Sequence, residues 1–211
     1  MEALGQMSRR SWASRARASF QVSETDKGSA WHAEALAEEL RSSAYQPSEM
    51  VCVAHSAAGM FLPALADIQP VRHMVFLAAL IPGPGISIID QFRADPSMFQ
   101  RAWVGKNPMD DNVALEFLYH DCPPERVDWA LSTRLDFYAK RAMEEPCPLT
   151  NWPSIPATYI VCADDRTISP GWQRRAAREW LGVAPVELPG GHCPHVSRPE
   201  ALADILENCA N

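Results

Sequence analysis

Residues 50–66, MVCVAHSAAGMFLPALA, decide the fold because they join an apolar strand, a sharp turn and a helix. The apolar run at residues 50–54 contains β-branched side chains and is typical of a buried parallel strand. His55 and Ser56 interrupt this run, and a helical pattern then continues to Ala66. A single serine between small residues at such a turn is the pattern of a nucleophile elbow, in which the strained backbone lifts the hydroxyl clear of the chain.

The neighbours of Ser56 fit this interpretation, although alanine replaces both glycines of the usual pattern. The tight turn needs small residues two positions before and after the serine, and Ala54 and Ala58 occupy these positions. Glycine is more usual at both, and here Gly59 comes one place late. The alternative is that Ser56 only caps the helix that follows, as serine often does. This stretch alone leaves both interpretations open.

Length, composition and charge limit the classes of protein to which the chain can belong. Its 211 residues fit one globular domain with a sizeable core, and 47% hydrophobic with 21% charged residues is ordinary for an α/β protein. The net charge of -7 and the pI near 5.3 argue against nucleic acid or an anionic membrane as a partner. No apolar run approaches the roughly 18 residues of a membrane span. We therefore expect a partner that is a small molecule.

The cysteines indicate a reducing compartment. Six of them are scattered along the chain without a CxxC pair, so we expect reduced thiols, a cytoplasmic location and no structural metal. Cys193 stands next to His192 and is a candidate nucleophile, but it is weaker than Ser56 because it lies in the loop that should carry the base. The sequence implies no metal and no organic cofactor.

The first residues of the chain differ from the rest. Residues 1–19 hold four arginines, four serines and one acidic residue, a composition shared by mitochondrial transit peptides and disordered tails. We predict that residues 1–28 are an N-terminal extension, disordered or atypical. The remaining residues, 29–211, then form a single domain.

Alternating strands and helices predict the fold class of this domain. Further buried strands are expected at residues 73–80, 157–163 and 183–188, and helices at residues 31–41, 57–66, 170–181 and 198–209. Strand, helix and strand in succession form a right-handed parallel crossover. The prediction is an α/β fold with a mostly parallel sheet covered by helices.

Residues 86–152 interrupt this alternation. The stretch is rich in proline and has helical patterns at residues 113–120 and 125–142, with no strong strand between them. An all-helical insertion of this size between two strands is more typical of a lid over a pocket than of a linker. We therefore predict a helical lid at about residues 86–152.

Three polar groups follow the ends of three expected strands. They are Ser56, one of the pair Asp164 and Asp165, and His192. In parallel α/β sheets the carboxyl ends of the strands form the edge where ligands bind. A serine hydroxyl needs a base to take its proton, and the imidazole needs a carboxylate to fix its tautomer. The spacing supplies all three groups.

With these motifs in place, the sequence resembles the α/β-hydrolase superfamily, and within it the small lidded esterase and hydroxynitrile-lyase-like group. The resemblance covers roughly residues 31–209. It rests on three stretches: residues 53–59 (VAHSAAG), residues 159–166 (YIVCADDR) with Pro170, Gln173 and Arg174, and residues 189–194 (PGGHCP).

The resemblance implies a role for each residue of the site. Ser56 is the nucleophile and His192 the base, while the N–H of Ala57 contributes to the oxyanion hole. Asp165 is the preferred acid, because the second acidic residue before Arg166 matches the family position, and Asp164 is the alternative. His55, directly before the serine, is a candidate pocket residue.

The start of the chain departs from the family pattern. Family members carry strands and a glycine-containing oxyanion loop ahead of the elbow, and no such stretch precedes Trp31 here. The fold is therefore expected to be an N-terminally shortened α/β-hydrolase fold whose open sheet edge leaves homo-oligomer formation open.

The expected function is that of a serine hydrolase of the carboxylic-ester type, which acts on a small ester or acyl substrate through an acyl-enzyme. One alternative is a weak or inactive homologue that serves as a ligand-binding or interaction protein. The other is a lyase on the same scaffold.

Overall fold

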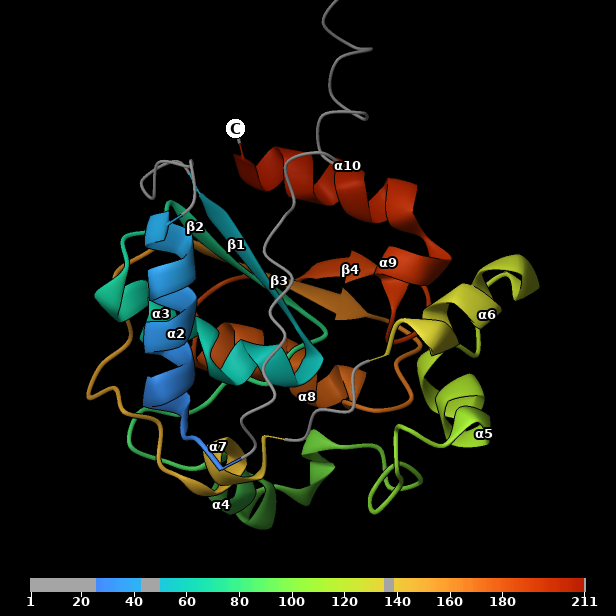
Figure 1. Cartoon of the computed structure of the whole chain (residues 1–211), viewed down its shortest axis with the longest axis horizontal. Coiled ribbons are helices and arrows are strands. Elements are labelled where there is room, and N and C mark those ends of the chain that lie inside the picture. Colours follow the sequence, from blue (N-terminus) through green and yellow to red (C-terminus); the bar gives the residue numbers. More distant parts are fainter. Residues whose placement is uncertain (1–25, 43–49, 135–138, 211) are drawn as a thin grey trace, which may run out of the picture.

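In the part of the chain that the structure describes, four parallel strands pair in the order β1-β2-β3-β4 (Figure 1). The computed structural model describes residues 26–42, 50–134 and 139–210. The strands are β1 (Val51–His55), β2 (His73–Leu77), β3 (Ala157–Cys162) and β4 (Val186–Leu188). Val53 pairs with Val75, and Ile160 pairs with Val186. Because all four strands are parallel, their carboxyl ends meet at one edge of the sheet.

Helices cover both faces of the sheet, and the alternation of side chains along β2 shows how. Met74 and Phe76 belong to the core cluster that includes residues of α2 (Ser29–Ser42), α3 (Leu62–Ile68) and α8 (Pro170–Glu179). Val75 and Leu77 face the opposite way and pack with α10 (Pro199–Ala210). Figure 1 shows α10 on one side of the sheet and α2, α3 and α8 on the other. The predicted fold class is confirmed.

The chain does not continue from the elbow as one helix. The sequence pattern predicts a helix over residues 57–66, but the structure has a 3₁₀ turn, η2 (Ser56–Met60), followed by α3. The amide of Phe61 donates to the carbonyl of Ala58, an i→i−3 bond that tightens the first turn. Pro63, which has no N–H to donate, falls in the first turn of α3, where a proline is tolerated.

The expected strand over residues 73–80 is also shorter, because β2 ends at Leu77. Ala78 follows with φ 42°, a left-handed conformation that turns the chain out of the sheet. The hydroxyl of Tyr159 fixes this bend, since it donates to the carbonyl of Ala79 (2.5 Å) and accepts from the Ala79 amide (3.0 Å). The next residue, Leu80, therefore passes directly beside the elbow.

Gly59 owes its place to that close approach. A Cβ atom at this position would lie 2.2 Å from the carbonyl oxygen of Leu80 and 2.8 Å from the Cβ of Ala79. Only glycine leaves room for both backbones. The glycine that comes one place late in the elbow pattern thus permits packing between the turn and the segment that follows β2.

Between β2 and β3 the described residues form short helices and no strand. They are α4 (Ile88–Ala94), η3 (Pro96–Met98), α5 (Asp111–Val113), η4 (Ala114–Leu118), α6 (Pro124–Ser132) and α7 (Lys140–Glu144). In Figure 1 these green to yellow segments gather beside the arrowheads of the strands. The helical pattern at residues 125–142 does not form one continuous helix, because α6 ends at Ser132. Residues 135–138 lie outside the described ranges. The role of this insertion as a lid stays a prediction.

The N-terminal extension expected at residues 1–28 lies mostly outside the described residues, which begin at Asp26. In the described ranges β1 pairs on one side only, with β2, and Val53 is 42% exposed. Within these same ranges, no helix is long and apolar enough to cross a membrane.

Candidate active site

Ser56 stands at the carboxyl end of β1 in a conformation that serine rarely adopts. Its φ is 56°, in the left-handed region, where a non-glycine residue costs about 1–2 kcal/mol. The structure holds it there from both sides: η2 begins at Ser56, and the amide of Leu80 donates to the Ser56 carbonyl (3.0 Å). Backbone strain of this kind is common at functional sites, where the surrounding structure maintains it.

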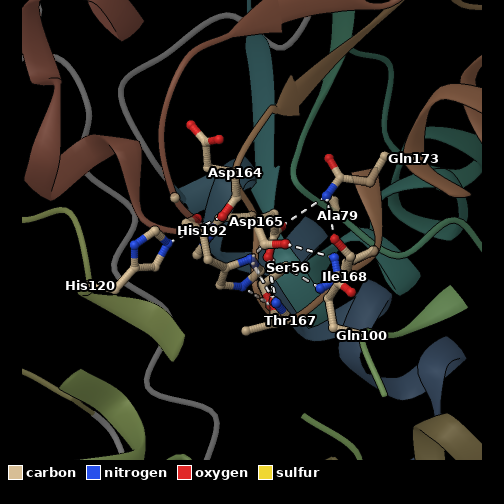
Figure 2. A network of polar contacts seen from close by, with 12 residues as sticks. Ser56, Ala79, Gln100, His120, Asp164, Asp165, Thr167, Ile168, Gln173 and His192 are labelled. Atoms are coloured by element: carbon tan, nitrogen blue, oxygen red, sulfur yellow. Dashed lines mark hydrogen bonds and ion pairs between the residues drawn. The ribbon is translucent and has the colours of Figure 1, made fainter. Parts of the chain in front are cut away.

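His192 brings an imidazole to this serine. It follows β4 and the turn at residues 189–191, and it is 2% exposed. Its Nε2 lies 2.9 Å from Oγ of Ser56 (Figure 2). This is hydrogen-bond distance, so the imidazole is placed to take the hydroxyl proton.

Asp165, which follows the end of β3, is the third member of a row of hydrogen-bonded side chains that begins with Ser56 and His192. Its carboxylate is 2% exposed, and its Oδ2 lies 2.8 Å from Nδ1 of His192. A carboxylate only accepts hydrogen bonds, so this contact places the ring proton on Nδ1 and leaves Nε2 free to accept from Ser56. Backbone amides of Thr167 (2.7 Å) and Ile168 (3.2 Å) donate to Oδ1 of the same carboxylate.

Asp164, the other aspartate considered for the acid, has a different position. It is exposed, and its Oδ2 accepts from the amide of Gly190 (3.0 Å) while its own amide donates to the Gly190 carbonyl (2.9 Å). Asp164 therefore ties the end of β3 to the turn that carries the base. The structure brings Asp165, and not Asp164, to His192.

Two side chains that the sequence analysis assigned no role also contact the acid. Thr167 Oγ1 lies 2.9 Å from Oδ1 of Asp165 and 2.8 Å from Nδ1 of His192. Gln173, in α8 and fully buried, donates from Nε2 to Oδ2 of Asp165 and to the carbonyl of Ile168, each at 2.8 Å. An Asp-x-Thr turn and a glutamine on the buried face of a helix were the available signals.

The turn before His192 is packed from outside by the insertion. Asp121 accepts from the amide of Gly191 (2.8 Å) and pairs with the guanidinium of Arg198. Burial opposes ionisation of Asp121, but the Gly191 amide and Arg198 outweigh it and hold its pKa below the usual range. Gly190 has φ 112°, and a Cβ there would lie 2.6 Å from Asp121 Oδ2. This accounts for the Gly-Gly pair.

The insertion also contacts the loop that carries Asp165. The amide of Gln100 donates to the carbonyl of Thr167 (2.8 Å), and its side chain donates to the carbonyl of Asp165 (3.2 Å). On the other side His120 Nε2 lies 3.2 Å from the carbonyl of Asp164. Figure 2 shows Gln100 and His120 on opposite sides of the site. The acid loop is therefore held between two segments of the insertion.

His55, predicted as a pocket residue, contacts the base instead. Its Nε2 lies 2.7 Å from the carbonyl of His192, and its ring centroid lies 4.7 Å from that of His192. Burial, and then the nearby charge of His192 and His195, lower the pKa of His55 well below its usual value. Because a carbonyl only accepts, the neutral His55 ring carries its proton on Nε2. It thus connects the end of β1 to the base loop.

Cys193, the weaker candidate nucleophile, is buried away from this row. It packs in an apolar cluster with Ala114, Tyr119 and Val196. Burial raises the pKa of its thiol well above the ordinary value, so the thiolate is disfavoured.

Space for a ligand adjoins the acid loop. An open hollow of about 630 Å³ is lined by Asp165 together with Gln100, Phe117 and His120 of the insertion. A second hollow, of about 530 Å³, surrounds His73 at the opposite edge of the sheet, far from the row of hydrogen bonds. Within the described ranges no cluster of histidine, cysteine and acidic side chains is arranged to hold a metal ion.

Comparison with known proteins places this geometry in a family. A family model described as the alpha/beta hydrolase family matches residues 7–205. Alpha/beta hydrolase nvfD of Aspergillus novofumigatus is 31% identical over 103 residues, 48% of this chain and 41% of that protein. A pyrethroid hydrolase of Sphingobium wenxiniae is 27% identical over 184 residues, 77% of this chain and 64% of that protein. The chain thus spans less than two thirds of the length of either relative.

A solved structure agrees in fold. The pyrethroid hydrolase of Sphingobium faniae JZ-2 superposes with a TM-score of 0.65 at 21% identity, covering 87% of this chain and 78% of that one. The range that the family model matches, residues 7–205, includes all three strand ends that carry Ser56, Asp165 and His192. The chain belongs to the alpha/beta hydrolase family.

Proposed function

We propose that the chain is a serine hydrolase that cleaves a small carboxylic ester through an acyl-enzyme on Ser56. The observation that carries the proposal is the unbroken row of hydrogen bonds from Ser56 Oγ to His192 Nε2 (2.9 Å) and from His192 Nδ1 to Asp165 Oδ2 (2.8 Å). It joins a nucleophile in a strained turn to a base and to a carboxylate that orients the base. Nucleophile, base and orienting group are the parts that acyl transfer requires.

The first half of the reaction forms the acyl-enzyme. His192 Nε2 takes the hydroxyl proton as Ser56 Oγ bonds to the ester carbonyl carbon, and Asp165 stabilises the imidazolium that results. The tetrahedral intermediate then collapses. The bond from carbon to the alcohol oxygen breaks, and the alcohol leaves with the proton from His192.

Water completes the cycle. His192 Nε2 removes a proton from a water molecule, whose oxygen bonds to the acyl carbon and displaces Ser56 Oγ. The serine recovers its proton from His192, and a carboxylic acid leaves. No metal or organic cofactor enters either half.

The negative oxygen of both intermediates needs a hydrogen-bond donor. The N–H of Ala57 lies in the first turn of η2, where backbone amides have no partner inside the turn. We assign it to the oxyanion. One such donor is worth about a hundred- to a thousandfold in rate.

The proposed substrate class is a small ester with an apolar acyl or alcohol part. One of the relatives is named as a hydrolase of pyrethroids, which supports this class. In this chain Phe117 lines the hollow beside Asp165 and packs against Trp103, with ring centroids 5.5 Å apart. Neither Ser56 nor His192 lines this hollow, so Phe117 favours an apolar group only on a part of the substrate that reaches past Asp165.

Labelling with a fluorophosphonate tests the proposal. Intact mass after treatment is expected to show one adduct on the wild type and none on Ser56→Ala. Folded protein, checked by circular dichroism, that takes up no label would overturn the acyl-enzyme. In that case binding of intact esters would favour the ligand-binding alternative, and cleavage of a cyanohydrin without ester hydrolysis would favour the lyase.

A further inference from the structure

We infer that Thr167 is a positioning residue that shares the Nδ1 proton of His192 with Asp165, an inference that rests on the proposed function. Its hydroxyl lies between the other two groups, 2.8 Å from His192 Nδ1 and 2.9 Å from Asp165 Oδ1 (Figure 2). Thr167 is 1% exposed, so water does not compete for these contacts through an open surface.

The direction of each hydrogen bond follows from the donors and acceptors present. A hydroxyl has one proton and two lone pairs, whereas a carboxylate has lone pairs only. Thr167 therefore donates to Asp165, and a lone pair of its oxygen remains toward Nδ1 of His192. The ring proton on Nδ1 consequently has two acceptors at equal distance, Asp165 Oδ2 (2.8 Å) and Thr167 Oγ1 (2.8 Å).

A purely local role does not account for this hydroxyl. Threonine after aspartate often closes a turn by bonding to it. Here the turn is already closed, because the amides of Thr167 (2.7 Å) and Ile168 (3.2 Å) both donate to Oδ1 of Asp165. Neither amide contacts His192, whereas the hydroxyl of Thr167 lies 2.8 Å from its Nδ1, beside the contact from Asp165.

Two acceptors on different residues hold the imidazole more firmly than one. A single contact to Asp165 allows the ring to rock about the Nδ1 proton, which moves Nε2 relative to Ser56 Oγ. A second contact from Thr167 removes that freedom. Displacement of His192 Nε2 from Ser56 Oγ slows proton transfer, but it does not change the contacts that bind the substrate.

Three variants test the inference by kinetics. Thr167→Val keeps the shape and removes the hydroxyl, Thr167→Ser keeps the hydroxyl, and Thr158→Val removes a similar threonine–histidine contact (2.9 Å, to His73) far from the site. We expect Thr167→Val to lower kcat about tenfold with KM unchanged, the loss that one hydrogen bond typically brings. Thr167→Ser and Thr158→Val are expected to stay within about twofold of the wild type.

A spectroscopic readout separates this inference from the proposed function. The Nδ1 proton of His192 is observed by NMR in ¹⁵N-histidine-labelled protein, whether or not the protein turns over an ester. With one acceptor removed, Thr167→Val should shorten the remaining bond to Asp165 and move this resonance to lower field. Thr167→Ser should leave the resonance in place.

The outcomes are distinct. An unlabelled Ser56 together with a shifted resonance would overturn the hydrolase and retain the shared proton. A resonance and a kcat that both stay unchanged in Thr167→Val would overturn the role of Thr167 in an active hydrolase.

Discussion

Two threonine–histidine pairs lie toward opposite ends of β3, and only one belongs to the proposed site. Thr158, near the start of the strand, lies 2.9 Å from His73 Nε2. Thr167, beyond its end, lies 2.8 Å from His192 Nδ1. The contacts are alike in residue type and length. They differ in the other groups that reach the imidazole.

His192 has a partner on each ring nitrogen, whereas among the described residues His73 has a hydrogen-bond partner on Nε2 alone. Asp165 reaches Nδ1 of His192 and Ser56 reaches Nε2. At the other end of β3, burial and then the charge of Arg72 lower the pKa of His73, which favours a neutral ring. A histidine becomes a candidate base through a carboxylate on one side and a proton donor on the other, and not through burial or a hydroxyl contact alone.

Removing each imidazole in turn gives the largest expected contrast. His192→Ala should lower kcat/KM for any ester that the protein cleaves by about 10⁴-fold or more, because both halves of the reaction need the base. His73→Ala should leave kcat/KM within about twofold and lower the free energy of unfolding by about 1 kcal/mol, through loss of the Thr158 contact. Initial rates and urea unfolding of both variants make the comparison. Equal losses of activity in His192→Ala and His73→Ala would contradict the assignment of the base to His192.

The elbow offers a second contrast, between two glycines. Gly59→Ala would place a Cβ 2.2 Å from the Leu80 carbonyl, and the backbone atoms there cannot yield as the end of a side chain would. We expect a loss of about 3 kcal/mol in the free energy of unfolding. Gly171→Ala in α8 is the matched control, because its Cβ would meet nothing closer than 3.7 Å and helix propensity favours alanine. Urea denaturation measures both. A Gly59→Ala protein as stable as the control would contradict the proposed packing between the elbow and the segment that follows β2.

The sequence was sufficient to predict the sheet and the row of three groups, for a physical reason. Buried parallel strands are apolar along their whole length, so their ends are easy to see, and parallel strands bring those ends to one edge. Ser56 and His192 each follow such an end alone. Asp164 and Asp165, by contrast, both follow the end of β3. The conformation of the turn decides which of two neighbouring side chains faces the base, and the sequence pattern does not reveal that conformation. The contacts to Gly190 and His192 distinguish them in the structure.

The groups that support the row were not predictable in the same way. Gln173 reaches Asp165 from α8 and Asp121 reaches Gly191 from the insertion, over separations that no local pattern records. The helical pattern at residues 125–142 does not form one continuous helix for a related reason. Apolar periodicity continues past Ser132, but tertiary contacts decide where a helix ends in a segment that packs against the rest of the domain.

Gln173 tests whether the site requires such support. Its amide donates twice, to Asp165 and Ile168, while its own Oε1 is buried without a hydrogen-bond partner in the described structure. Gln173→Met should lower kcat about tenfold, because the carboxylate loses one of its donors. The free energy of unfolding should change by less than about 1 kcal/mol, since the unpaired oxygen is removed together with the two bonds. Kinetics and urea unfolding on the same preparation measure both. A large loss of stability with kcat unchanged would make Gln173 a purely structural residue.

The smallest expected effect is a pH dependence of stability that arises at His55. Its pKa in the folded protein lies well below the ordinary value of about 6.5 that it regains on unfolding. The unfolded chain therefore binds a proton that the folded chain does not, and stability is full above about pH 6.5 and falls as the pH drops below it. Between pH 6.5 and pH 5.5 this site alone should cost up to about 1 kcal/mol in the free energy of unfolding.

His55→Gln, which keeps an amide N–H for the His192 carbonyl, should lose less stability than the wild type over that interval. Urea unfolding of the wild type and of His55→Gln at both pH values gives the difference. Equal losses in the wild type and His55→Gln would mean that His55 takes up its proton in the folded protein, which would contradict the fixed, neutral ring between the elbow and the base.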